Sequence, residues 1–169
     1  MLGTYQSFPE NVQKIAYFVS SVSYKRLQKA MIEAFCKLNT ENLRLEDFGV
    51  PSISGCRVIF ELGIAEGQTF NYVDDDERKR VLKSIEDKPF HVMDFLSVIR
   101  YHKMLGEKAT PLKFDYYMLR FVFDKDSVEL RIFHEKGSMH VAPDELAGFL
   151  CGKVNGMFSR KILKAVEAS

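Results

Sequence analysis

The spacing of apolar residues divides this chain into segments with a helical period and segments with the two-residue period of a strand. Over residues 12–38 the apolar side chains recur every three or four positions, as on the buried side of an amphipathic helix. Ser7 and Glu10 have the spacing of a capping box, and Pro9 suits a first helical turn, so we expect this long helix to begin there. A cluster of serines within residues 20–23 indicates a break in it.

Two pairs of segments alternate between apolar and polar residues and predict two β-hairpins. The first hairpin runs over residues 57–64 and 69–73, with a short turn between them. The second runs over residues 114–123 and 128–135, on either side of a four-residue polar turn. Because its strands are long and lack proline, we expect this second hairpin to lie in the middle of a sheet.

Three further helices are predicted between and after the hairpins. Acidic residues at 74–77 mark the start of one, because negative charge is favourable at a helix N-terminus. Apolar residues with helical spacing predict another over residues 92–106, although residues 90–95 also fit a short strand. Pro143 opens the last helix. Residues 39–55, which contain proline, serine and glycine, indicate a connector.

This order of elements, α-ββ-αα-ββ-α, predicts an α+β fold. We expect an antiparallel sheet of four to five strands, built from the two hairpins and packed by helices mainly on one face. The length suits a single globular domain over residues 1–169. The order resembles that of roadblock-type and secretion-chaperone-type folds in topology, without a motif of either family.

Composition and charge exclude several classes of protein. The chain is 46% hydrophobic and 28% charged, which is ordinary for a globular protein and excludes a disordered or collagen-like one. Its 24 basic and 23 acidic residues give a net charge of +1, so no global charge attracts nucleic acid or an acidic membrane.

Three widely separated cysteines without a Cys-x-x-Cys pair indicate free thiols. Without a signal peptide or an apolar run of membrane-spanning length, the protein is expected to be cytoplasmic, with no membrane partner.

Three glycines stand four positions apart near the C-terminus. On one helix, Gly148, Gly152 and Gly156 would stack along one face, although each costs roughly 1 kcal/mol relative to alanine. Such a strip predicts the close approach of another backbone or a ligand, and it favours a homodimer. The sequence leaves open whether the helix over residues 143–167 is continuous or breaks at Gly152 or Gly156.

The densest polar cluster is RIFHEKGSMHV, which contains Arg131, His134, Lys136 and His140. Two histidines flanking a glycine turn could bind a metal or an anion, but the spacing is not diagnostic. A strand-end histidine bonded to backbone is the commoner arrangement, so we predict no catalytic residue, no metal ligand and no cofactor. Arg120 shares a strand face with apolar residues, which indicates pairing with a carboxylate or a ligand-facing surface.

These observations favour a non-enzymatic protein-interaction or adaptor-type module that self-associates as a homodimer and binds a protein partner. The binding or interface candidates are Gly148, Gly152, Gly156, Arg120, Arg131, His134, Lys136 and His140. One alternative is a nucleic-acid-binding domain that uses basic helices beside the 114–135 hairpin. A second alternative is a small-molecule or metal-dependent enzyme centred on His134 and His140.

Overall fold

A computed structural model of the chain describes residues 1–49 and 55–166, and its ten strands form one antiparallel sheet. The path through the sheet is β1 (Gly3–Thr4), β5 (Thr69–Tyr72), β4 (Cys56–Glu66), β6 (Val92–Leu105), β8 (Asp115–Phe123), β9 (Ser127–Lys136), β2 (Lys14–Ser20) and β10 (Leu163–Val166). Off this path, β3 (Leu43–Arg44) pairs with β4, and β7 (Lys108–Pro111) pairs with β6.

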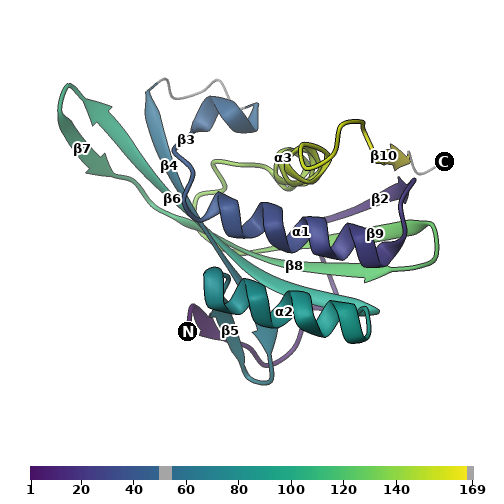
Figure 1. The fold of residues 1–169 in the computed structure, drawn as a ribbon. Helices are drawn as coiled ribbons and strands as arrows, with labels where there is room; N and C mark the ends of the chain where they lie inside the picture. The colour runs from purple at the N-terminus through teal and green to yellow at the C-terminus, as the bar shows by residue number, and fades with distance from the viewer. Residues whose placement is uncertain (50–54, 167–169) are drawn as a thin grey trace.

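Three α-helices in this part of the chain cover one face of the sheet (Figure 1). They are α1 (Tyr24–Leu38), α2 (Asp75–Asp87) and α3 (Pro143–Asn155), and a short 3-10 helix, η1 (Leu45–Phe48), follows β3. The main core fills the space between these helices and the sheet. Phe35 of α1 shows how it is packed, because its ring meets those of Phe95 and Phe121 with centroids 5.2 and 6.0 Å away.

The α+β class and the antiparallel sheet are confirmed, but the predicted four to five strands and the order α-ββ-αα-ββ-α are wrong. Both predicted hairpins form, as β4–β5 and β8–β9, and the second lies in the middle of the sheet. The acidic run also opens α2, with the Asp74 carboxylate accepting the backbone N–H of Glu77 at 2.9 Å. The errors lie in the segments around these elements.

The first error is at the N-terminal end, where a helix was expected from Pro9. The structure places strand β2 at Lys14–Ser20, and α1 begins only at Tyr24. The apolar positions in residues 12–22 fit both the helical period and the two-residue period of a strand. Residues 14–20 form a strand because their backbone pairs with that of β9. The serine cluster does mark a boundary, because β2 ends there and the Ser23 side chain accepts the Arg26 N–H at the start of α1.

The second error is the helix expected over residues 92–106, which is the long strand β6. Its backbone pairs with β4 on one side and β8 on the other. Its residues 95–99 are buried on both sides because both faces of this part of the sheet are covered, so the two-residue alternation is lost there. A run of this kind cannot be distinguished from a buried helix by periodicity.

The last helix ends at Asn155 with Gly156 as its C-cap, which resolves the open question of its length. The chain then forms β10 instead of continuing as a helix to residue 167, and this strand extends the sheet beside β2. The expected connector contains β3, η1 and Gly49 in a left-handed conformation, while its residues 50–54 lie outside the described part.

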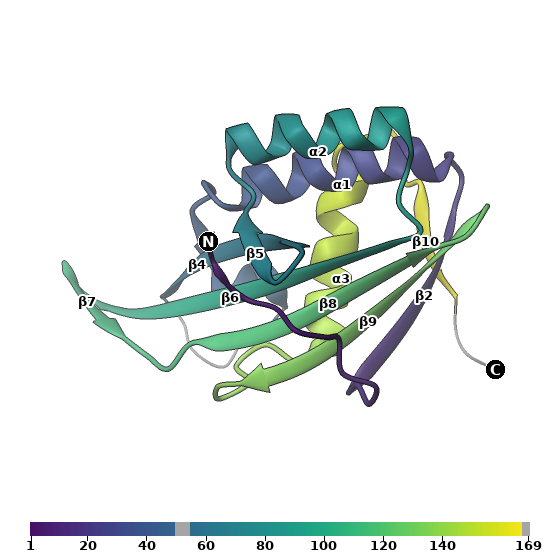
Figure 2. The same cartoon turned by 90° about the horizontal axis from the view of Figure 1, so that it is seen from below.

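The opposite face of the sheet is covered in part by the N-terminal segment, residues 1–8 (Figure 2). This segment crosses the face as an extended chain and packs on a second, smaller apolar cluster. The buried members of that cluster are Phe70, Leu96, Val98 and Met118, and Leu2, Tyr5 and Phe8 lie against them. The far side of the sheet is therefore divided into a covered and an uncovered half.

Candidate functional site

The polar cluster around His134 and His140 converges on Asp115, which the sequence analysis did not select. The Asp115 side chain is fully buried at the start of β8. Its carboxylate accepts the Tyr101 hydroxyl at 2.6 Å and the backbone N–H groups of Met139 and His140 at 2.6 and 3.0 Å. The His134 Nε2 atom lies 2.9 Å from the same carboxylate. Four groups therefore surround one buried carboxylate.

The loop after β9 closes tightly around this carboxylate. Gly137 has a φ of +118°, and a Cβ built there would lie 2.8 Å from the Cα of Asp115 and closer still to its Oδ1. The Tyr117 hydroxyl holds the end of the loop by donating to the carbonyl of Val141. Burial, followed by the bond to Asp115, raises the pKa of Tyr101 far above its usual range, so its hydroxyl remains a donor.

The other members of the predicted cluster do not join a common site. His140 contributes only its backbone N–H to Asp115, while its ring meets that of Tyr101 edge-on at 4.7 Å. Arg131 pairs with Glu129 on the same strand at 3.0 Å, and the Lys136 ammonium lies 4.4 Å from the Tyr116 ring centroid. Among the residues described, no group of three His, Cys, Asp or Glu side chains is placed to hold a metal ion. What the cluster does in this geometry is hold the loop.

Arg120 lies on the covered part of the far face, and it pairs with a carboxylate, which is one of the two arrangements that the sequence left open. Its Nε and Nη2 atoms bond the two oxygens of Asp94 at 2.8 and 2.9 Å. The hydroxyl of Tyr5 donates to Asp94 Oδ2 at 2.5 Å, and the Arg120 guanidinium lies 4.7 Å from the ring centroid of Phe8. Burial and the bond to Asp94 raise the pKa of Tyr5 to about 12. The N-terminal segment is thereby attached to this pair, which no local pattern could show.

The glycine strip faces open space. Within the described residues, no neighbouring atom outside the backbone of α3 lies within 4 Å of a Cβ built at Gly148 or Gly152. Grooves of about 620 and 460 Å³ run along the two sides of this face of α3. The expected close approach is therefore not made within the described part of the chain.

Gly152→Ala is accordingly expected to stabilise the monomer by about 0.5–1 kcal/mol, because the new methyl group meets nothing and alanine restricts the unfolded chain. Urea denaturation, at a concentration where light scattering shows a monomer, measures the change. Gly67→Ala is the control, because its φ of +61° strains any L-residue and should lower stability. A loss of stability at Gly152 would show that this face is already packed.

The uncovered half of the far face carries a group of exposed apolar side chains on strands β2 and β10. Ile15, Tyr17 and Val19 alternate along β2 and are 38%, 44% and 47% exposed. Val166 of β10 lies directly opposite Tyr17 and is 47% exposed. We refer to Ile15, Tyr17, Val19 and Val166 as the β2–β10 patch, and it lies where the strand order ends.

Charged residues of both signs lie beside the β2–β10 patch. Across the sheet, Glu129 opposes Tyr17 and Arg131 opposes Ile15, and these two charged residues pair with each other. Lys164 of β10 opposes Val19 on the other side. The patch is therefore an apolar surface with a polar rim, which is the usual composition of a protein-binding surface.

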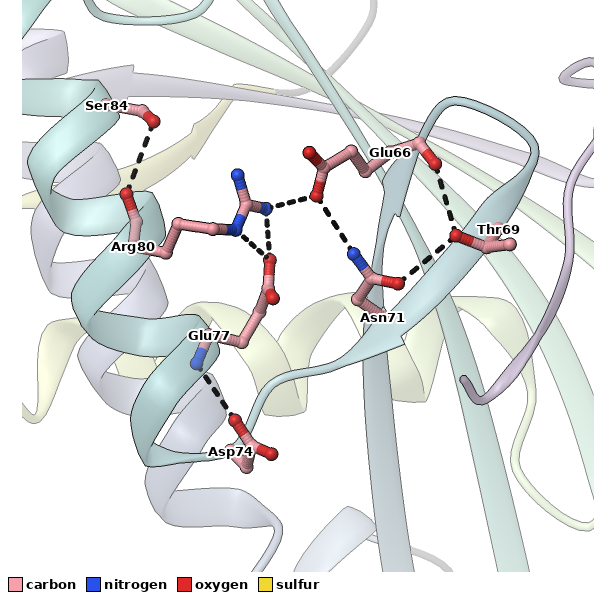
Figure 3. Close-up of polar contacts among 7 residues, drawn as sticks. All are labelled: Glu66, Thr69, Asn71, Asp74, Glu77, Arg80 and Ser84. Atoms are coloured by element: carbon pink, nitrogen blue, oxygen red, sulfur yellow. Dashed lines mark hydrogen bonds and ion pairs between the residues drawn. The ribbon is translucent and has the colours of Figure 1, made fainter.

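Five of the eight basic residues on α1 and α2 form ion pairs. Lys25 and Lys29 both reach Glu86, and Arg78 pairs with Glu33 at 2.8 Å. Arg80 bonds Glu77 on its own helix and Glu66 on β4, and Glu66 also accepts the Asn71 amide (Figure 3). This network neutralises positive charge and ties the β4–β5 hairpin to α2.

Comparison of the chain with models of protein families, with curated proteins and with solved structures finds no match in any of the three. In the described part of the chain, no helix combines the length and the apolar character needed to cross a membrane.

Proposed function

We propose that this protein is a non-enzymatic protein-interaction module that forms a homodimer through the β2–β10 patch. The observation that supports this function is the set of four large apolar side chains left uncovered on two neighbouring strands at the end of the sheet. An apolar surface of this kind with a polar rim marks an interaction site in soluble proteins. The N-terminal segment covers another part of the far face, over Phe70, Leu96, Val98 and Met118.

A second copy of the same chain is the partner that fits the patch. In a two-fold dimer the same surface meets itself, so it must be complementary to itself in charge as well as in shape. Negative Glu129 and positive Arg131 lie on the β9 side of the patch and positive Lys164 lies on its β10 side, which allows opposite charges to meet across a two-fold axis. The net charge of +1 also means that two copies repel each other little.

The test is the double variant Tyr17→Ser/Val19→Ser, analysed by light scattering and sedimentation over a range of concentrations. Each burial of a large apolar side chain is worth about 1.5–3 kcal/mol, so dimer affinity should fall by roughly a hundredfold or more. Ile59→Ser is the matched control, because Ile59 is equally exposed on β4 but lies outside the patch. A wild-type chain that stays monomeric, or a double variant that dimerises unchanged, contradicts the proposal.

We further propose that the homodimer binds a protein partner and that it is located in the cytoplasm. The three cysteines are free thiols, which fits a reducing compartment. The two alternatives from the sequence have less support. Five of the eight basic residues on α1 and α2, which would attract nucleic acid, form ion pairs, and the groups around His134 and His140 are engaged in holding a loop.

A further inference from the structure

We propose that the sheet surface beneath the N-terminal segment is a binding site for an extended peptide, which the segment itself occupies as an internal ligand. The partner it fits is an extended segment of another protein that carries an aromatic hydroxyl and a second aromatic residue three positions later. This is the spacing of Tyr5 and Phe8 in the internal ligand. The site is separate from the β2–β10 patch and does not rest on the proposed dimer.

The backbone of the segment binds as an added strand. Its strand β1 pairs antiparallel with β5, with Gly3 opposite Phe70. The N–H of Leu2 donates to the carbonyl of Phe70 at 2.7 Å, and the N–H of Tyr5 donates to the carbonyl of Gln68 at 2.8 Å. Main-chain pairing at the end of a sheet is a common mode of peptide recognition, and it does not depend on the identity of the peptide.

Side-chain subsites supply the selectivity. Leu2 lies over Gly63, where a Cβ would come within 3.0 Å of its Cδ2 atom, so the absence of a side chain on β4 makes room for it. The Tyr5 ring packs on Phe70 with centroids 4.8 Å apart. The ring of Phe8 lies over the guanidinium of Arg120.

The polar anchor of the site is Asp94, whose side chain is only 10% exposed. Arg120 holds both of its oxygens, and this leaves Oδ2 positioned to accept the hydroxyl of Tyr5. A site built around a buried acceptor discriminates against an analogue that lacks the hydroxyl. The pair therefore selects tyrosine over phenylalanine at the first aromatic position.

The surface under the segment has its own supports. The β4–β5 hairpin, on which the segment pairs, is held to α2 by Arg80, Glu66 and Asn71 (Figure 3). Leu96 and Met118 lie on the central strands β6 and β8. None of these supports involves the N-terminal segment, so the site keeps its shape when the segment leaves.

The segment itself is weakly held. Every residue in positions 1–13 is exposed or half-buried, and β1 contributes only two residues of pairing. Elements with so little buried surface open at low free-energy cost. Opening uncovers four side chains that are now buried, namely Phe70, Leu96, Val98 and Met118. The apolar surface formed by these four side chains, once exposed, is available to a competing peptide.

The experiment uses a full-length variant, Tyr5→Ser/Phe8→Ser, in which the internal ligand has lost both anchors. A fluorescent peptide with the sequence of residues 1–12 is titrated with this protein, and its anisotropy is followed. We expect saturable binding, and binding of a Tyr5→Phe peptide that is about tenfold weaker, because a hydrogen bond to a charged group is lost. Wild-type protein should bind the peptide at least about tenfold more weakly, since its own segment competes at high effective concentration.

Gln6→Ala/Ser7→Ala is the matched control, because both residues are exposed in the same segment and the site should stay closed. The single full-length variant Tyr5→Phe keeps the ring, and it should bind the peptide with an affinity between those of the wild type and the double variant. Circular dichroism establishes that each variant is folded. Absence of binding by the folded Tyr5→Phe and double variants, or equal binding of a scrambled peptide, overturns the proposal. Adding Tyr17→Ser/Val19→Ser should leave peptide binding unchanged, which separates this site from the dimer.

Discussion

Replacing Asp115 with alanine is expected to lower the free energy of unfolding by about 3–5 kcal/mol. The substitution leaves the Tyr101 hydroxyl and two backbone N–H groups of the loop after β9 without an acceptor in a buried place. It also removes the partner of His134 Nε2. Urea denaturation followed by circular dichroism measures the loss. We expect the loop to become mobile before the sheet unfolds.

Two further variants show whether the loss of stability comes from the hydrogen bonds that the Asp115 carboxylate accepts. Asp115→Asn has nearly the same size but places an amide donor against the donors of Met139 and His140, so most of the loss should remain. Asp126→Ala removes an exposed carboxylate from the β8–β9 turn and should change stability by less than about 0.5 kcal/mol. An alanine variant at Asp115 as stable as the wild type would mean that the carboxylate does not hold the loop.

Replacing Gly137 with alanine is expected to cost about 3 kcal/mol or more, for a steric reason. A Cβ at this position would overlap the Asp115 carboxylate and the carbonyl of Phe114, and it would lie 2.8 Å from the Cα of Asp115. The backbone atoms of Phe114 and Asp115 cannot move away easily from a new methyl group. The φ of +118° at Gly137 adds conformational strain for any L-residue. The readout is the free energy of unfolding, again in urea.

The matched control for this steric argument is Gly106→Ala. Gly106 also has a positive φ, +64°, but nothing lies within 4 Å of its Cβ position in the described structure. The free energy of unfolding of Gly106→Ala should therefore fall only by the conformational cost of about 1 kcal/mol. Equal losses at the two glycines would refute the close approach of the loop to Asp115, and with it the interpretation of the His134 cluster as a structural support.

The polar cluster around Asp115 holds the loop after β9, so we propose functional surfaces elsewhere on the molecule. The β2–β10 patch and the site under the N-terminal segment lie on the far face of the sheet, away from the helices. The first depends on side chains that are exposed in the described part of the structure, and the second on side chains covered by a weakly held part of the chain. Different variants test them independently.

Local patterns in the sequence determined the elements whose stabilising interactions are local. The β8–β9 hairpin follows from alternating side chains and a polar turn, and α2 follows from Asp74 and the acidic turn after it. Pro143 likewise marks the start of α3. The pairing of Arg120 with a carboxylate could be expected because a charged group in apolar surroundings needs a partner, although Asp94 could not be named.

Tertiary structure alone decided what residues 14–20 and 92–105 become. Both segments have apolar residues at helical spacing, and both become strands because neighbouring strands supply pairing for their backbones. The middle of β6, residues 95–99, is buried on both faces, so the alternation that identifies a strand is missing there. The strand count and the order of elements could not be obtained from periodicity for this reason.

The sites depend on tertiary structure even more strongly, because their partners are distant in sequence. Tyr5 and Asp94 are separated by 89 positions and Asp115 and His140 by 25, and no pattern within either segment records that they meet. The glycine strip was visible in the sequence, but only the packing of α3 shows that its face is open. The sequence by itself thus determined the local elements and the types of residue that need partners. The choice of those partners, and of the surfaces left uncovered, was decided by the sheet, because long-range pairing is what brings the segments together.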